Sequence, residues 1–219
     1  MNTGKTIQKI NGVKEKISDL SFSPSGKWLA SCSACNNLDY KNWIAVWDML
    51  NPKPVFKIET VFNSDHNDCY AIRFTRDEKF LIGALNEALI KIDIAAKKIV
   101  LQEPLKYEFA CESFGFVLTP KYIVLATKDK KVTIHDADTL KEIGSISVPA
   151  NFWYLDVSAD GNTIAVCQER AILLYDIKTK ALLKTIDNPR KENFRMAQFS
   201  ADGKFLIAAA DMYLVRFEL

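Results

Sequence analysis

Apolar residues between positions 153 and 187 fall into four short runs, each bounded by residues that favour turns. Between the first two runs lies the cluster Ser158-Ala159-Asp160-Gly161-Asn162, which is typical of a tight reversal of the chain. This stretch predicts a single antiparallel meander of four strands. The runs span residues 153–157, 163–167, 171–175 and 181–186.

The same pattern recurs along the chain, which indicates an internal structural repeat. Each unit has a first turn with a Ser/Thr-x-x-Gly-like pattern and a third strand that ends on an acidic residue. These residues lie at positions 48, 93, 136, 176 and 218, so successive units are 45, 43, 40 and 42 residues apart. The turns are FSPSGK (22–27), FTRDEK (74–79), LTPK (118–121), VSADGN (157–162) and FSADGK (199–204).

The middle strands of these units are almost continuously apolar, as in the segments IAVW and LLYD. A strand of this kind is expected where both faces of its sheet are covered by neighbouring sheets. Radial stacking of the repeated sheets would provide this cover.

Composition indicates an ordinary soluble globular protein and no overall field for steering onto nucleic acid or anionic membrane. The chain has 219 residues, of which 48% are hydrophobic and 26% charged, with a formal net charge of +2. The N-terminus lacks the apolar core of a secretory signal. Five cysteines, an odd number, favour reduced thiols in a reducing compartment. We expect a cytoplasmic protein, with the nucleus as the alternative.

The pair Trp47-Asp48, the FSPSGK and FSADGK turns and a period near 42 resemble the WD-repeat β-propellers over essentially the whole chain. Only the first unit keeps the literal Trp-Asp pair, and the Gly-His dipeptide of that family survives at most as Asp65-His66. The resemblance implies an all-β fold: one five-bladed β-propeller domain over residues 1–219, made of four-stranded antiparallel sheets. The predicted blades are residues 17–60, 69–103, 113–148, 153–187, and 194–219 together with 5–10.

The two ends of the chain predict how the ring closes. The fifth unit stops after its third strand, while the apolar run at residues 5–10 precedes the first unit and shares the Lys-Thr-Ile order of residues 184–186. We therefore expect residues 5–10 to pair with the third strand of the last sheet. Such closure leaves no open sheet edge and gives a monomeric ring. The alternative is an incomplete ring that a second copy completes.

Function is predicted from the loops that join fourth strands to first strands and second strands to third strands. In the resembled family these loops form the usual partner-binding face, and here they are long at residues 33–42, 60–68 and 103–112. Long loops on a rigid scaffold often carry recognition, and exposed aromatic residues often dominate it. We expect a non-catalytic scaffold that binds a protein or peptide partner. The candidate residues are Tyr40, Asp65, His66, Tyr107, Phe109, Phe152, Trp153 and Arg190. For Phe152 and Trp153, packing between blades is the alternative.

Catalytic, metal and cofactor sites are not predicted. Cys32 and Cys35 have metal-ligand spacing without a second pair of ligands, and His135 is expected to be a packed or rim residue. No motif for a nucleophile, a nucleotide or a zinc hydrolase occurs. Two alternative functions stay open. Asp65, Asp68, Glu108 and Glu112 suit a metal-dependent propeller hydrolase, and Lys128-Asp129-Lys130-Lys131 with Arg190-Lys191 suits a weak nucleic-acid binder.

Deleting residues 1–11 tests the closure of the ring. We expect a loss of solubility or of the monomeric state, because the deletion would leave the edge of the last sheet without its fourth strand. Thermal melting and size-exclusion chromatography measure both properties. An unchanged melting curve together with monomeric elution would refute the proposed pairing.

Overall fold

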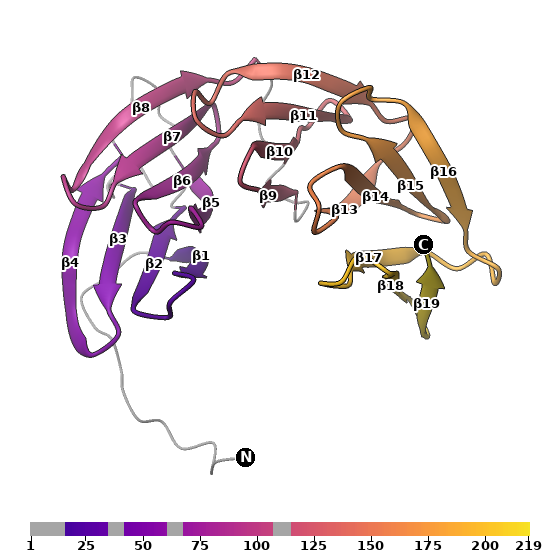
Figure 1. Cartoon of the computed structure of the whole chain (residues 1–219), viewed down its shortest axis with the longest axis horizontal. Coiled ribbons are helices and arrows are strands. Elements are labelled where there is room, and N and C mark those ends of the chain that lie inside the picture. Colours follow the sequence, from indigo (N-terminus) through magenta and orange to yellow (C-terminus); the bar gives the residue numbers. More distant parts are fainter. Residues whose placement is uncertain (1–15, 35–41, 61–67, 107–114) are drawn as a thin grey trace, which may run out of the picture. The chain divides into compact units, whose positions relative to one another are not determined.

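The residues that the structure describes fold into β-strands joined by turns, as the apolar runs predict. A computed structural model describes residues 16–34, 42–60, 68–106 and 115–219. Within these ranges there is no helix that is long and apolar enough to cross a membrane. The chain separates into two compact units, residues 1–104 and 105–219. Figure 1 shows the strands of each unit gathered into repeated antiparallel sheets.

The first unit contains two four-stranded sheets in which every strand pairs with its neighbour in the sequence. Sheet 1 consists of β1 (Ile17–Phe22), β2 (Trp28–Ser33), β3 (Trp43–Asp48) and β4 (Asn51–Glu59). Sheet 2 consists of β5 (Cys69–Phe74), β6 (Phe80–Leu85), β7 (Ala88–Asp93) and β8 (Lys98–Pro104).

The second unit contains three further sheets with the same sequential order. The meander predicted for residues 153–187 is confirmed as sheet 4. Sheet 3 consists of β9 (Phe116–Leu118), β10 (Tyr122–Ala126), β11 (Lys131–Asp136) and β12 (Glu142–Ser147). Sheet 4 consists of β13 (Phe152–Val157), β14 (Thr163–Gln168), β15 (Ala171–Asp176) and β16 (Leu182–Asp187). Sheet 5 consists, among the described residues, of β17 (Phe194–Phe199), β18 (Phe205–Ala210) and β19 (Leu214–Glu218).

The repeated first turn is held by a hydroxyl group, which explains its sequence pattern. Ser158 Oγ accepts a hydrogen bond from the Thr163 N–H at 2.9 Å and donates one to Asp160 at 2.5 Å. Gly161 in this turn has φ of 73°, a backbone conformation that glycine adopts without steric cost. Glu78 takes the equivalent place in sheet 2 with φ of 58°. The turn therefore requires a positive φ at this position, and both Gly and Glu occur there.

The acidic residue at the end of the third strand also has a structural explanation. Asp136 Oδ1 accepts hydrogen bonds from the Thr139 N–H and hydroxyl, both at 2.8 Å. Asp176 and Thr179 repeat this arrangement at 2.6 Å and 2.8 Å. A carboxylate that accepts N–H groups from the following residues stabilises a tight turn. The regularly spaced acidic residues in the sequence therefore mark the turns between third and fourth strands.

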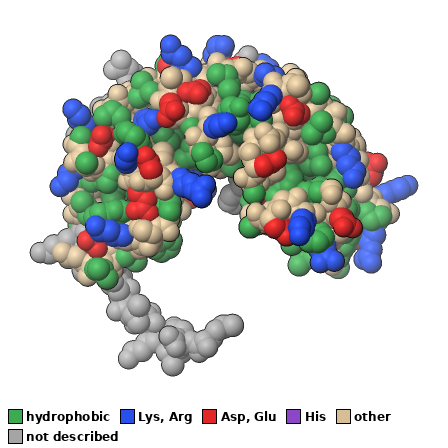
Figure 2. All heavy atoms as spheres, in the orientation of Figure 1, with side chains coloured by type: hydrophobic (Ala, Val, Ile, Leu, Met, Phe, Trp, Pro, Cys, Tyr) green, Lys and Arg blue, Asp and Glu red, His purple; other side chains and the backbone are tan. Residues whose placement is uncertain are grey.

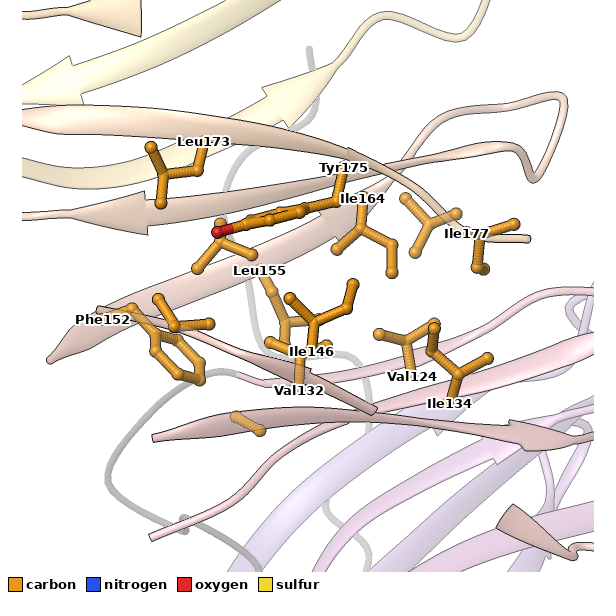
Figure 3. Close-up of a cluster of buried hydrophobic side chains, with 14 residues drawn as sticks. Val124, Val132, Ile134, Ile146, Phe152, Leu155, Ile164, Leu173, Tyr175 and Ile177 are labelled. Atoms are coloured by element: carbon orange, nitrogen blue, oxygen red, sulfur yellow. The ribbon is translucent and has the colours of Figure 1, made fainter. Parts of the chain in front are cut away.

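Within each unit the core lies between neighbouring sheets, and the middle strands of sheet 4 bury both of their faces. On β15, Leu173 and Tyr175 belong to the apolar cluster shared with sheet 3, which Figure 3 shows, whereas Ile172 and Leu174 belong to the cluster shared with sheet 5. A third cluster joins sheets 1 and 2. The prediction that sheets cover both faces of the middle strands is therefore confirmed for sheet 4.

Sheet 1 holds a buried hydrogen bond on the face opposite to the one that packs against sheet 2. Trp47 Nε1 donates to Ser31 Oγ at 2.8 Å, and both residues are buried. Trp47 also packs with Trp43 and Ala45. In the resembled family a buried hydrogen-bond set joins His, Asp, Ser or Thr, and Trp, and the degenerate repeats predict that no unit here forms it in full. The pair in sheet 1 corresponds to the Ser and Trp of that set.

The predicted ring closure concerns residues 5–10, which lie outside the described residues, so it stays a prediction. The single domain over residues 1–219 also stays a prediction. In sheet 1 the first strand exposes Leu20 by 53% and Phe22 by 62%. At the equivalent positions of sheet 2, Ile72 and Phe74 are buried against sheet 1. First strands thus carry an apolar face against which a preceding sheet can pack.

Changing Ser31 to Ala tests the buried hydrogen bond of sheet 1. We expect a loss of about 1–3 kcal/mol in the free energy of unfolding, because the Trp47 indole N–H would remain buried without its acceptor. Urea denaturation measures this loss. In the double variant Ser31→Ala, Trp47→Phe the combined loss should be smaller than the sum of the two single losses. Ser147→Ala, at an exposed strand position, is the control, and an equal loss there would contradict the interpretation.

Candidate functional site

Connections between fourth and first strands lie beside the turns between second and third strands in each unit. In the first unit the Thr60 N–H donates to the Asn42 carbonyl at 2.8 Å. In the second unit the Asn188 N–H donates to the Arg170 carbonyl at 2.8 Å, and the Val148 N–H donates to the Lys130 carbonyl at 2.9 Å. The prediction that these connections share one end is therefore confirmed within each unit for the described residues. We call this end the loop end.

A β-bulge recurs at the loop end of the first strands. The pairing of β1, β5, β13 and β17 with the following strand shifts after its first residue. A bulge inserts one extra residue, bends the strand and re-aims a side chain, and bulges are common next to binding sites. The same backbone position in four sheets is therefore suited to presenting a side chain at the loop end. The residues at this position are Ser18, Tyr70, Trp153 and Arg195.

In the first unit the bulge residue Tyr70 belongs to a buried polar cluster. The Tyr70 hydroxyl donates to Asp68 Oδ2 at 2.8 Å, and Asn42 Nδ2 donates to Asp68 Oδ1 at 2.9 Å. Asp68 is only 4% exposed, so these donors replace the water that its carboxylate loses on burial. The Trp43 N–H donates to the buried Ser33 hydroxyl at 2.9 Å. This cluster fixes the ends of the connections before β3 and β5.

In the second unit the bulge residue Trp153 is 40% exposed, and anchored residues lie in the neighbouring connection. The Arg190 guanidinium lies 4.6 Å from the centre of the Tyr213 ring, a cation–π contact. The Tyr213 hydroxyl donates to Asn188 Oδ1, which also accepts the Arg190 N–H at 2.9 Å. These contacts fix the position of Arg190 within the chain itself.

The other bulge residue of this unit, Arg195, is paired with an acid. Arg195 Nε lies 2.7 Å from Asp211 Oδ1, and the Asp211 N–H donates to the Asn193 carbonyl at 3.2 Å. Met212, the next residue, is 81% exposed. We define the unit 2 loop surface by the residues Trp153, Arg170, Arg190, Lys191, Arg195, Asp211 and Met212.

Of the predicted site residues, Trp153 and Arg190 are exposed at the loop end of the second unit. Phe152 is 8% exposed and packs in the cluster between sheets 3 and 4, as Figure 3 shows, so it has the packing role that was its alternative. The bulge explains why these two neighbours differ in exposure. Five predicted residues lie outside the described residues: Tyr40, Asp65, His66, Tyr107 and Phe109.

The predicted long loops also lie largely outside the described residues. Their boundaries need small corrections, because strand pairing extends further than the turn residues indicate. Ser33 belongs to β2, and Glu103 and Pro104 belong to β8, so the connections begin after these residues.

Sequence reasoning did not find Asn188, Tyr213 and Met212. The connection that contains Met212 is short, and no feature of the sequence distinguishes Tyr213 from a core aromatic residue. Their contribution follows from the pairing of β18 with β19 and from the contact of Tyr213 with the connection before β17. Of these three residues, Met212 is the one that a search for apolar residues in short turns would have found.

Histidine and cysteine have structural roles among the described residues. His135 is buried, with Nδ1 2.9 Å from the Leu140 carbonyl oxygen and Nε2 3.0 Å from Thr133 Oγ1, so the prediction of a packed histidine is confirmed. Cys32, Cys69 and Cys167 are free and buried. Burial raises the pKa of Cys167 to about 12, so this thiol is protonated at neutral pH. In the described ranges no three His, Cys, Asp or Glu side chains are placed to hold a metal ion.

Repeated antiparallel sheets, with hydroxyl-held first turns and acidic third-strand ends, define an all-β repeat protein and are consistent with a β-propeller. Comparison with protein families agrees with this class. Residues 4–48 match the family model described as WD domain, G-beta repeat, and the repeated sheets fit a WD-repeat family. No curated protein matches the chain.

Asp156 connects the first strands of sheets 4 and 5, and it offers a test of their packing. Its Oδ2 accepts the Phe199 N–H at 2.9 Å. Burial raises the pKa of Asp156 above the ordinary value for Asp, because its charged form loses water. The folded state therefore binds this proton more tightly than the unfolded state, so the stability of the protein falls as the pH rises through the raised pKa.

The variant Asp156→Asn keeps an acceptor for the Phe199 N–H and removes the buried charge. We expect a higher melting temperature than that of the wild type at neutral pH. The difference should shrink as the pH is lowered through the raised pKa of Asp156, because the wild-type carboxyl then becomes neutral. Differential scanning fluorimetry over this pH range measures it. A variant that is less stable than the wild type at neutral pH, or a difference that does not change with pH, would contradict the assignment.

Proposed function

We propose that this protein is a non-catalytic scaffold that binds a protein or peptide partner through its loop ends. WD-repeat proteins generally mediate protein–protein interactions, and the family match together with the repeated sheets supports this proposal. The loop ends carry the side chains that differ between otherwise equivalent sheets. We propose that these differences provide the specificity for the partner.

The observation that carries the proposal is the unit 2 loop surface. Trp153 is 40% exposed on a strand whose neighbours Phe152 and Leu155 are fixed in the core. Arg190 is anchored by Tyr213 and Asn188. Both residues lie at the loop end of the second unit, and Trp and Arg are among the residue types that most often dominate binding energy at protein interfaces. Because these residues are held in advance, binding would cost little conformational entropy.

The long loops of the sequence extend this proposal. We propose that Tyr40, Asp65, His66, Tyr107 and Phe109 contribute to the same function from the connections at residues 33–42, 60–68 and 103–112. The cytoplasmic location and the monomeric ring also stay proposals, and subcellular fractionation and light scattering would test them.

The hydrogen bonds of Asp68 argue against the alternative function of a metal-dependent hydrolase. Asp68 is the one candidate acid of that hypothesis within the described residues, and both of its carboxylate oxygens accept hydrogen bonds from neighbouring side chains. A carboxylate that is occupied in this way, and is buried, is suited to fixing a loop. A steep dependence of binding on salt concentration would support the nucleic-acid hypothesis instead.

Affinity capture from the native cell with the full chain tests the scaffold function. We expect Trp153→Ala to lose captured partners relative to the wild type, with a loss of affinity of about tenfold or more if Trp153 is a hot spot. Quantitative mass spectrometry of the captured proteins measures the loss. The matched control is Leu182→Ala, which truncates a similarly exposed apolar residue at the opposite end of sheet 4.

A second variant, Tyr40→Ala with Tyr107→Ala and Phe109→Ala, tests the contribution of the long loops in the same experiment. Partners that are retained equally by the wild type, by Trp153→Ala and by this triple variant would contradict the proposed function. Loss in the Leu182→Ala control as well would show that the effect is not specific to the loop end.

A further inference from the structure

We propose that Cys32 and Cys69 form a redox-sensitive pair, which an oxidant of the peroxide class joins by a disulfide bond between sheets 1 and 2 when strand β1 opens. This inference concerns the first unit alone and does not rest on the proposed scaffold function. On the face that Figure 2 draws, basic and acidic side chains are interspersed with hydrophobic ones, so charge marks no separate site there. The two thiols are a more specific feature, because they come from different sheets and lie in contact.

The two cysteines meet at the loop end of the first unit. Cys32 lies on β2 and Cys69 is the first residue of β5, so a bond between them would join sheet 1 to sheet 2. Cys32 Sγ donates to the Cys69 carbonyl at 3.2 Å. Burial, and next a hydrogen bond with the Cys32 side chain, raises the pKa of the Cys69 thiol well above its ordinary value. A small shift would therefore bring the two sulfur atoms to the bonding distance of about 2.05 Å.

In the closed state of the first unit this pair is protected from oxidation. Cys32 and Cys69 are both fully buried. The thiolate, and not the thiol, attacks an oxidant, so a buried and protonated pair reacts slowly. The reduced form is therefore the resting form, and oxidation requires that the pair first be uncovered.

Strand β1 is a cover that can open. Its bulge residue Ser18 has Oγ 3.3 Å from Cys32 Sγ, and this hydroxyl donates to the Cys69 carbonyl at 2.5 Å. β1 is an edge strand of sheet 1, and its residues Leu20 and Phe22 are exposed. An edge strand with few buried apolar contacts opens locally without unfolding the rest of its sheet. Separation of β1 from β2 would uncover the side of the pair that Ser18 contacts.

Asp19 holds this cover closed. Its Oδ2 accepts the Ile72 N–H at 2.9 Å and lies 2.5 Å from Arg73 Nη1. These contacts join β1 directly to β5, next to the two cysteines. Their loss would favour the open state of β1.

One molecule of hydrogen peroxide balances the redox step. In the open state one cysteine loses its proton, and its sulfur attacks a peroxide oxygen. The O–O bond breaks, which leaves a sulfenic acid on the cysteine and, with the released proton, one water molecule. The second thiol then attacks the sulfenic sulfur, forms the S–S bond and releases a second water molecule. Both sulfur atoms are oxidised, and both peroxide oxygens are reduced to water.

Treatment of the full chain with hydrogen peroxide, followed by alkylation of free thiols, proteolysis without reductant and mass spectrometry, tests the pair. We expect a linked pair of peptides that contain Cys32 and Cys69, and dithiothreitol should separate them. The oxidised protein should melt at a higher temperature than the reduced protein, because the bond constrains the unfolded chain between residues 37 positions apart. Cys69→Ser should lose both effects. Cys167→Ser, which removes a buried thiol of the second unit, is the matched control and should keep both.

The rate of cross-linking tests the role of β1. Asp19→Ala should raise this rate by about tenfold, because the closed state loses a hydrogen bond to a charged group. Asp19→Asn keeps an acceptor for the Ile72 N–H and should raise it less. Asp156→Ala breaks the equivalent bond to Phe199 in the second unit and should leave the rate unchanged. An equal rise for Asp19→Ala and Asp19→Asn would assign the effect to the lost charge, and would overturn the role of opening.

Three outcomes would overturn the redox pair itself. The first is a bond from Cys32 to Cys35 in place of Cys69, and the second is a bond between Cys32 and Cys69 that forms only in urea. The third is an equal loss of free thiol at Cys167 over the same time. Each would show that the contact between the two sheets does not direct the oxidation. The scaffold function is unaffected by all three, because its test depends on Trp153→Ala.

Discussion

Burial of both faces of sheet 4, by sheet 3 on one side and by sheet 5 on the other, is the constraint on which the rest of the second unit depends. On β15 adjacent residues face opposite clusters, with Leu173 against sheet 3 and Leu174 against sheet 5. A sheet with two apolar faces cannot be stable alone in water, so each repeat needs the next one. The first unit shows the same coupling, where Ile72 of sheet 2 packs into the cluster shared with sheet 1.

This stacking explains how a regular scaffold carries an irregular surface. The core fixes Phe152 and Leu155 on β13, and the bulge between them leaves Trp153 exposed at the loop end. Packing of sheet 5 on sheet 4 brings Tyr213 to the connection that contains Asn188 and Arg190. The side chains that we propose for recognition are therefore positioned by apolar contacts elsewhere in the same sheets.

Much of the fold could be predicted from the sequence, because its signals are local. The hydroxyl of Ser158 and the carboxylate of Asp176 form hydrogen bonds within a few residues of their own positions, so the turns leave a direct pattern in the sequence. Continuous apolar runs such as LLYD indicate sheets covered on both faces. Pairing of residues 5–10 with the last sheet depends on contacts across the whole chain, and it stays a prediction.

The site was harder to predict, because it depends on register and on long-range contacts. The bulge residues Ser18, Tyr70, Trp153 and Arg195 share no residue type, so nothing in the sequence marks their common position. Strict alternation cannot decide which of Phe152 and Trp153 is buried, since the bulge interrupts the alternation between them. Anchoring of Arg190 by Tyr213 joins two connections that are separated by two strands.

The most direct test of sheet stacking compares two leucines of sheet 4 by urea denaturation. Leu155 is 1% exposed between sheets 3 and 4, and Leu183 on β16 is 57% exposed. If stacking is the main source of stability, Leu155→Ala should lower the free energy of unfolding by about 2–5 kcal/mol, and Leu183→Ala should change it by less than about 0.5 kcal/mol. Equal losses for the two variants, or no loss for Leu155→Ala, would contradict the account.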